Sequence, residues 1–179
     1  QSSGFRRCVR VTPVVDGVTD DNLDAFFQDL DVVIDECDDF RIKYRIREEA
    51  RRRKIPVLME TSDRGLVDVE RFDLEPQRPP FHGLLPGVCS EDLREMGDGE
   101  KLKMLLQLMD PHRISTRGCA SLLETKETLD GWPQLASAVV LGGATACAAV
   151  RRIALGQAVP SGSRRVDIES VLAAESEPY

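Results

Sequence analysis

The sequence predicts an α/β protein built on a doubly wound, mostly parallel sheet. Between residues 8 and 60, segments with strand character alternate with segments with helix character, in the order strand, helix, strand, helix, strand. The strand segment 31–35, DVVID, contains a continuous apolar run, which is typical of a parallel strand buried on both faces. A chain of 179 residues, 41% of them hydrophobic, is long enough to bury one core of this kind.

The first elements each have a local signal. Residues 8–14, CVRVTPV, alternate and are rich in β-branched side chains, which predicts the first strand. In 19–30, the N-cap residue Thr19 precedes apolar residues at helical spacing, which predicts a helix. The segment 39–53 carries apolar residues on one stripe, so a second helix is expected there. The short apolar run 55–60 then predicts the next strand.

Later elements are assigned in the same way. Residues 65–74 alternate loosely and predict a strand, and helices are expected at 90–96 and 100–110 on either side of the sequence GDG. A polar segment follows. A helix is expected at 133–156. Its apolar run 135–150 is too short for a membrane span, and Arg151 and Arg152 follow at once, so we expect a buried helix. Residues 164–172 are expected to form a last strand or an extended tail.

Composition excludes several classes of function. The net charge of −7 argues against a general nucleic-acid partner, which requires a basic surface. The first residues contain no apolar segment of the kind found in signal peptides, and we expect no membrane association. The five cysteines are scattered, without a CxxC pair, so a zinc site is not expected. A reduced, cytoplasmic protein is the interpretation that fits best.

Acidic residues cluster directly after the strand at 31–35. They are Asp35, Glu36, Asp38 and Asp39. In doubly wound sheets, ligands bind at the carboxyl ends of the strands, so carboxylates there could hold Mg²⁺ with nucleotide phosphates or bond a ribose hydroxyl. The alternative is a solvated loop in which Asp39 caps the following helix.

Basic residues dominate the helix that follows this cluster. Lys43 or Arg47, on its first turns, could neutralise a polyphosphate held by Asp38, and the alternative is a solvated helix face. After the next strand, Thr61 would line the same crevice and Arg64 could bind a phosphate or carboxylate with two parallel hydrogen bonds. The alternative there is a plain turn.

Two motifs carry a resemblance to a known family. Asp31–Asp39 and Lys54–Val57 resemble the ThiF/MoeB family of adenylating enzymes, which are related to ubiquitin-activating enzymes, and 133–157 resembles the late helix of that family. The resemblance implies a Rossmann-like fold and ATP-dependent adenylation of a carboxylate, often the C-terminus of a small ubiquitin-like or sulfur-carrier protein. ATP and Mg²⁺ are the implied cofactors. Asp38 falls on the essential aspartate of the family, which works with Mg²⁺ and the ATP phosphates, and Asp35 would lie beside it.

The chain also departs from the family pattern. Asp39 replaces an asparagine, Lys43 replaces an arginine, and Arg47 replaces the helix asparagine. The glycine-rich phosphate loop does not occur. We therefore interpret the chain as the C-terminal part of a domain in a divergent branch, inactive alone, whose N-terminal part belongs to the same protein or to a second chain. Without that part, the strands 8–14 and 31–35 are not expected to be neighbours.

The same interpretation divides the chain into three parts. Residues 1–80 would form the second half of the nucleotide-binding domain, 81–131 a crossover with inserted helices, and 132–179 the C-terminal helix and strand of the same domain. Cys89 and Cys119 are the thiols that could act as carriers after adenylation. A homodimer is expected, and the small residues of VVLGGATAC could form its interface or pack tightly on the sheet. The rival functions are a non-catalytic ThiF-like scaffold module and a nicotinamide-binding domain.

Overall fold

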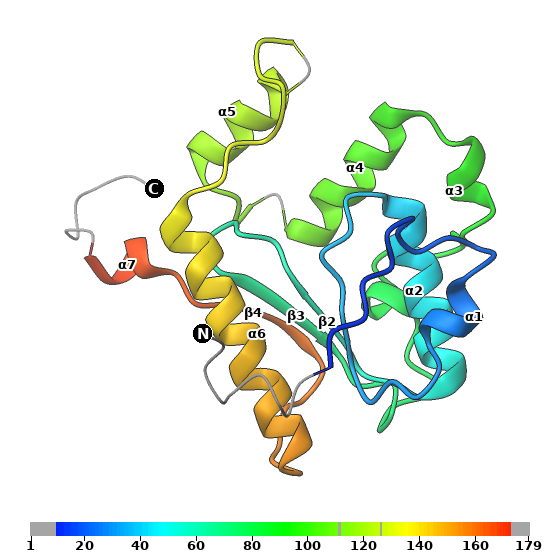
Figure 1. Ribbon diagram of the computed structural model, residues 1–179. Helices are drawn as coiled ribbons and strands as arrows, with labels where there is room; N and C mark the ends of the chain where they lie inside the picture. The colour runs from blue at the N-terminus through cyan, green and yellow to red at the C-terminus, as the bar shows by residue number, and fades with distance from the viewer. Residues whose placement is uncertain (1–9, 111, 126, 173–179) are drawn as a thin grey trace, which may run out of the picture.

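Four strands form one mixed sheet in the computed structural model, which describes residues 10–110, 112–125 and 127–172 (Figure 1). The strands stand in the order β1-β2-β3-β4, with β1 parallel to β2 and with β2, β3 and β4 antiparallel to their neighbours. Their bounds are β1 Val33–Ile34, β2 Val57–Glu60, β3 Leu66–Glu70 and β4 Gly162–Arg165. The α/β class predicted from the sequence is confirmed.

Helices surround this sheet within the described residues. They are α1 Leu23–Phe26, α2 Phe40–Arg53, the 3₁₀-helix η2 Pro80–Gly83, α3 Asp92–Glu95, α4 Asp98–Met109, α5 Thr116–Glu124, α6 Ala136–Ala154 and α7 Ile168–Leu172. Of these, α2 and α6 pack directly on the strands, and α3 and α4 pack on α2 through a second apolar cluster.

The unit β1-α2-β2 is the part of the fold that the sequence predicts best. Asp39 caps α2 by accepting a hydrogen bond from the Ile42 amide at 3.0 Å. At the other end Lys54 adopts a left-handed conformation and its amide donates to the Ala50 carbonyl, which stops the helix. The chain then returns as β2, parallel to β1, with Val33 opposite Val57.

The prediction of a mostly parallel sheet is wrong for the described residues. β2 and β3 are joined by the five-residue turn 61–65, and so short a connection can only link antiparallel neighbours. β4 joins the far side of β3, also antiparallel. Only the pair β1 and β2 is parallel among the three strand pairs.

Helices cover both faces of the sheet. Val57 packs into the apolar cluster under α2, whereas the next residue, Leu58, packs into the cluster that holds Val150 and Ile153 of α6. Neighbouring residues of a strand point to opposite faces, so α2 and α6 lie on opposite sides of β2. In Figure 1, α6 and α2 lie on either side of the labelled strands.

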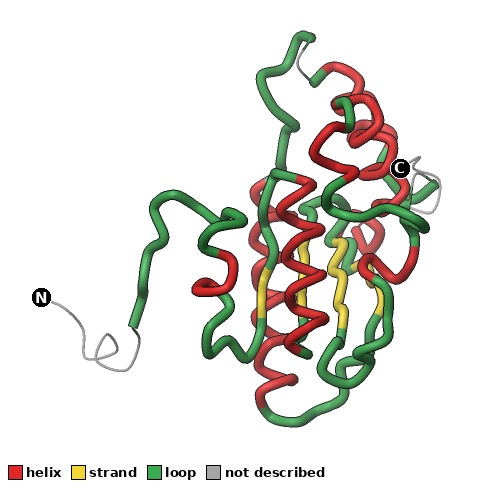
Figure 2. The backbone as a smooth tube through the Cα atoms, turned by 90° about the vertical axis from the view of Figure 1, so that its right-hand side faces the viewer, coloured by secondary structure: helices red, strands yellow, loops and turns green. Residues whose placement is uncertain are grey.

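The N-terminal predictions are only partly correct. Residues 10–14 form no strand and are exposed, so the strand predicted at 8–14 is wrong there, and residues 8 and 9 lie outside the described part. Figure 2 shows this segment standing apart from the sheet. The helix expected at 19–30 is reduced to α1, because the Asn22 side chain accepts from the Thr19 amide and donates to the Gly17 carbonyl, and so forms a turn where Thr19 was expected to be the cap.

Three later expectations also need correction. The strand at 65–74 ends at Glu70, since a turn follows in which the Leu74 amide donates to the Arg71 carbonyl. Helix α5 lies in the polar segment for which the sequence predicts no element, and its N-cap Ser115 accepts from the Gly118 amide at 3.0 Å. The last strand is β4, and residues 168–172 of the predicted strand or tail form α7 instead.

Helix α6 lies on the sheet along one narrow stripe. Gly142 and Ala146 are its buried residues, and the Glu60 carboxyl lies so close to Gly142 that an added Cβ atom would stand 2.0 Å from Glu60 Cδ. Most other residues of α6 are exposed, including Val140 at 72%, so the prediction of a buried helix is wrong for most of its surface. By length and composition alone α6 could also cross a membrane, a test that core helices of soluble proteins pass as well.

Candidate functional site

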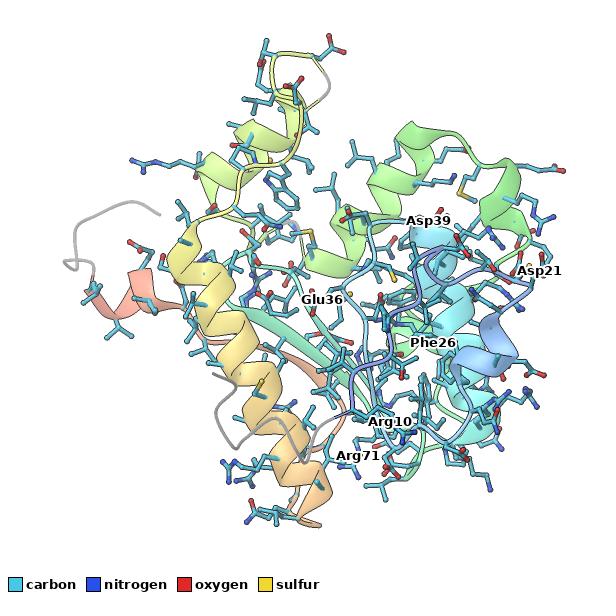
Figure 3. All side chains as sticks on the ribbon, viewed as in Figure 1. Arg10, Asp21, Phe26, Glu36, Asp39 and Arg71 are labelled. Atoms are coloured by element: carbon cyan, nitrogen blue, oxygen red, sulfur yellow. The ribbon has the colours of Figure 1, made fainter. Side chains whose placement is uncertain are left out.

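The candidate site lies at the carboxyl ends of β1 and β2. Because the two strands are parallel, the segments that follow them, 35–38 and 61–64, emerge at the same edge of the sheet. Figure 3 shows Glu36 near the start of α2, where Asp39 is labelled. All the acidic residues singled out from the sequence are therefore in one region, but they have different partners.

Asp35 is bound inside the protein. Its carboxylate is buried and accepts from Arg47 Nη1 at 2.5 Å and from Lys43 Nζ at 3.4 Å, and it also accepts from the Cys37 amide at 3.1 Å. Burial alone would raise the pKa of Asp35, but the positive charges of Arg47 and Lys43 outweigh it and hold the pKa below its usual value. Asp35 is thus neutralised by Arg47, and Lys43 makes a second, longer ion pair with it.

Arg47 is the centre of a buried ionic network. Its guanidinium has no exposed surface, bonds Asp35 and Glu70, each at 2.5 Å, and stacks over the Phe81 ring at 3.9 Å from the ring centroid. The proposal that Arg47 neutralises a bound polyphosphate is therefore wrong. The solvated-face interpretation is wrong for this residue as well, because the helix face that carries Arg47 faces η2 and β3.

Asp38 and Asp39 have separate roles. Asp39 is occupied as the N-cap of α2. Asp38 is exposed, and its carboxylate has no hydrogen-bond or ion-pair partner among the residues that the structure describes. Of the acids at 35–39, Asp38 is thus the one whose carboxylate has no partner among the described residues.

Sequence reasoning missed the pairing of Glu36 with Glu60. Glu36 Oε1 accepts from the Glu60 amide at 3.2 Å, and the Glu60 carboxylate accepts from the amide and hydroxyl of Ser62. Partial burial of the Glu36 carboxyl, helped by the nearby charge of Glu60, raises the pKa of Glu36 to about 7 although the residue as a whole is exposed. Glu60 lies at the end of β2, which comes after α2 in the sequence. Its proximity to Glu36 therefore follows only from the parallel pairing of β1 with β2.

The turn after β2 is held by the C-terminal part of the chain. Arg64 donates to Asp167 at 2.7 Å and to the Arg113 carbonyl at 3.1 Å, so its guanidinium is engaged within the protein. Thr61 is half-buried, and its hydroxyl accepts from the Asp63 amide at 3.4 Å. The structure thus places both predicted residues at the expected edge, with protein partners.

This turn has an uncommon backbone. Ser62, Arg64 and Gly65 all have positive φ angles, and a Cβ atom on Gly65 would stand 2.1 Å from the Val166 carbonyl oxygen. Arg165 holds the turn from the other side by donating to the carbonyl and the carboxylate of Asp63. The turn is therefore fixed in place by residues about 100 positions later in the chain.

The thiols differ in exposure. Cys119 is exposed on α5, and Cys89 is half-buried, where a hydrogen bond to the Asp92 carboxylate raises its pKa. Burial and the neighbouring charge of Asp35 raise the pKa of Cys37 to about 11. Of the two thiols singled out from the sequence, Cys119 is the more exposed.

A second polar cluster lies at β3. His82 Nε2 and the Ser163 hydroxyl both contact Asp68 Oδ2, at 2.7 Å and 2.5 Å. Since the histidine and the serine bond the same carboxylate oxygen and not each other, the arrangement is not that of a nucleophile and its base. Asp68 of β3 lies opposite Ser163 of β4, so the cluster links the edge strand β4 to the sheet.

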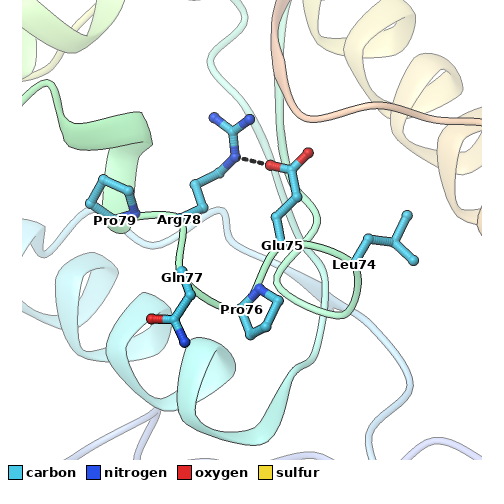
Figure 4. A pocket seen from close by; sticks show the side chains of 6 residues that line it. All are labelled: Leu74, Glu75, Pro76, Gln77, Arg78 and Pro79. Atoms are coloured by element: carbon cyan, nitrogen blue, oxygen red, sulfur yellow. Dashed lines mark hydrogen bonds and ion pairs between the residues drawn. The ribbon is translucent and has the colours of Figure 1, made fainter.

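Two further features bear on ligand binding. A surface hollow is lined by Leu74 to Pro79, and in it Arg78 bonds Glu75 (Figure 4). This hollow follows β3, which runs antiparallel to β2, and so it lies at the opposite end of the strands from the carboxyl ends of β1 and β2. Within the described ranges, no three acidic, histidine or cysteine side chains are arranged to hold a metal by themselves.

The chain is similar to one curated protein of unknown activity. It is 47% identical over 159 residues to the uncharacterized protein MT1398 of Mycobacterium tuberculosis (strain CDC 1551 / Oshkosh). The match covers 89% of this chain and 22% of that protein, so the chain spans about a fifth of the length of this relative. No family model and no solved structure matches the chain.

Proposed function

We propose that this chain is the C-terminal part of a ThiF-type adenylating domain with a Rossmann-like sheet, and that Asp38 is its catalytic carboxylate. The observation that carries the proposal is that the three aspartates after β1 have different partners. Asp35 is neutralised by Arg47, Asp39 caps α2, and Asp38 alone of these three is exposed without a partner among the described residues.

The chemistry of one free carboxylate fits Mg²⁺ that arrives with ATP. Magnesium in such sites keeps several waters and uses one or two protein carboxylates together with substrate phosphates, so a preformed three-ligand cage is not required. When bound, the ion would neutralise the phosphate charge that develops as a carboxylate of the acceptor attacks the α-phosphorus and pyrophosphate leaves. Asp38 would hold and orient the ion at the end of β1.

Other residues near the carboxyl ends of β1 and β2 also support this assignment. Lys43 replaces an arginine of the family pattern and bonds Asp35 at 3.4 Å, a long contact that leaves a positive charge near the site. Thr61 and Arg64 lie on the turn at the same edge. The glycine loop would come from other polypeptide, and in the relative from M. tuberculosis 78% of the protein lies outside the matched region.

The acceptor belongs to the same proposal. A small carrier protein would present its C-terminal carboxylate to the α-phosphorus, in a homodimeric protein of the cytoplasm. Cys119, exposed on α5, is the thiol that could receive the activated acyl group, and Cys89 is the alternative.

A non-catalytic scaffold is the second candidate. The position where the family carries its helix asparagine is Arg47 here, and that side chain is buried between Asp35 and Glu70. A residue enclosed in this way cannot contact a nucleotide, which favours a module that kept the fold and lost the reaction.

ATP–pyrophosphate exchange separates the two candidates. The assay uses the protein as its own gene encodes it, with Mg-ATP and pyrophosphate, and compares Asp38→Asn with Asp21→Asn, an exposed aspartate outside the site. The enzyme should lose about 100-fold or more of its exchange rate in Asp38→Asn, because the electrostatic support of the transition state is removed, and should retain it in Asp21→Asn.

Native mass spectrometry with and without Mg-ATP completes this test. An increment of one nucleotide mass that disappears in Asp38→Asn supports the enzyme. A folded protein that takes up no nucleotide and catalyses no exchange would leave the scaffold function.

A further inference from the structure

The strand β1 has a neighbour on one side only. The amides of Val33 and Asp35 donate to β2, to the carbonyls of Pro56 at 3.0 Å and Leu58 at 2.8 Å. Backbone groups alternate in direction along a strand, so the amide and carbonyl groups of the residues between them face the other way. Within the described residues no strand receives them, and β1 is an edge of the sheet.

This edge is unlike the opposite edge of the sheet. β4 has the sequence Gly-Ser-Arg-Arg, in which Ser163 and Arg164 are exposed, and polar side chains are usual for an edge strand that faces water. β1 lies instead in the apolar run Val32 to Ile34, a composition typical of a strand with neighbours on both sides. Ile34 is 47% exposed, whereas Val33, on the face under α2, is 4% exposed.

The uncovered surface continues onto the face of the sheet that α6 partly covers. Val32 packs at the margin of the cluster under α6, and Ile34 points to the same face because it is two residues further along the strand. Helix α6 covers β2 and β3 and leaves its own Val139 and Val140 40% and 72% exposed. The segment 10–17 does not cover the edge, since all its residues are exposed.

Charge decides what can bind there. Acids stand at both ends of β1, with Asp31 before it and Glu36 and Asp38 after it. If two copies paired edge to edge about a two-fold axis, Asp31 of one copy would face the acids at 35–38 of the other, and like charges opposite each other destabilise a strand pair. A second copy is therefore a poor occupant.

We infer that the open edge of β1 binds an extended apolar segment flanked by basic residues, supplied by polypeptide of the same protein outside residues 1–179. Its backbone pairs with Val32 and Ile34, its apolar side chains cover Ile34, and its basic residues meet the acids at the two ends. The length of the M. tuberculosis relative, of which the match covers 22%, supports this source. The surface does not depend on nucleotide binding, so it stands even if the protein adenylates nothing.

Hydrogen exchange of single amides tests this inference. The measurement compares the protein as its own gene encodes it with the 179-residue chain, at several concentrations. In the encoded protein the Ile34 amide should exchange about 100-fold more slowly than in the chain, because it gains a hydrogen bond. The Val33 amide, bonded to β2 in both samples, serves as the internal reference.

A pair of variants tests the same contact. Ile34→Pro removes the amide that faces the open edge and should abolish the added protection of Val32, whereas Ile34→Val keeps the amide and should preserve it. An unprotected Ile34 amide in the unsubstituted encoded protein overturns the inference without any variant. Protection that grows with concentration, together with a doubled mass, overturns it in favour of a second copy.

Discussion

At the scale of single residues, the buried guanidinium of Arg47 is the centre of the buried ionic network. Two carboxylates, Asp35 and Glu70, are buried only because this cation lies between them. One oxygen of Glu70, Oε1, is buried without a hydrogen-bond partner among the described residues, so the network is already under-satisfied. Removal of the cation would leave Glu70 without its positive partner and Asp35 with only the longer contact to Lys43.

We expect Arg47→Met to lower the free energy of unfolding by about 3–5 kcal/mol, because two buried charges lose their partner. Urea denaturation measures the change. Arg52→Met is the matched control, since Arg52 is on the same helix with its side chain 63% exposed, and it should change stability by less than about 0.5 kcal/mol. Equal effects of the two substitutions would contradict the network as described.

Glu36 should give the protein a recognisable dependence on pH. Because the pKa of its carboxyl is raised from 4.5 to about 7, the folded state binds a proton that the unfolded state releases. This contribution to stability is present below pH 4.5 and is lost as the pH rises through 7. Relative to the wild type, Glu36→Gln should therefore become more stable between pH 4.5 and 7, with a constant difference above.

Urea titrations at pH 5, 6, 7 and 8 check this expectation. Glu95→Gln, a substitution of an exposed glutamate on α3, should show a constant difference from the wild type over the same range. Parallel curves for Glu36→Gln and the wild type would rule out the raised pKa.

The residues of the site could be predicted only in part. The sequence places Asp35 and Asp38 at the end of one strand, but it does not show which of them is neutralised. That depends on Arg47, which reaches Asp35 from the facing helix, and on Glu70, which comes from a strand added later in the chain. Contacts between elements decide which charges are free, and such contacts are not a local property.

At the scale of elements, α6 depends on one close approach. Gly142→Ala should lower the free energy of unfolding by about 1–3 kcal/mol, because the new Cβ atom would overlap the Glu60 carboxyl, which Ser62 holds in place. Gly143→Ala, one position away, meets nothing within 4 Å and should raise stability by about 0.5–1 kcal/mol through helix propensity.

Thermal and urea unfolding of the two variants measures this contrast. Because the substitutions are chemically identical and adjacent, a difference in sign reports the packing of α6 on β2. A gain in stability for Gly142→Ala would show that the helix lies further from the sheet.

The elements were predictable where pattern and caps agreed. The helix at 39–53 has an N-cap, an apolar stripe and a following strand, and α2 matches it closely. The segment 8–14 has the alternation of a strand, but alternation creates no strand without a neighbour to bond, and residues 10–14 have none among the described residues. Helix α5 was missed because its apolar content is low and its N-cap Ser115 lies in a polar region.

At the scale of the whole molecule, the two edges of the sheet are built differently. The β4 edge is polar, whereas the β1 edge is apolar and flanked by acids. The sequence predicted that the strands 8–14 and 31–35 would not be neighbours, and because residues 10–14 form no strand, this stays a prediction. It did not predict that β4 would join β3, because antiparallel partners far apart in the sequence leave no local signal.

Arg165 and Asp167 hold the turn 61–65 in place, and this has a consequence for synthesis. Arg64 is translated 103 positions before its partner Asp167, which at roughly 5–20 residues per second corresponds to about 5–20 s on the ribosome. During that time the outer edge of β3 has no neighbour and the turn has no clamp. The turn at the candidate site therefore gains its clamp only after β1, α2 and β2 have already been made, when residues 165–167 emerge.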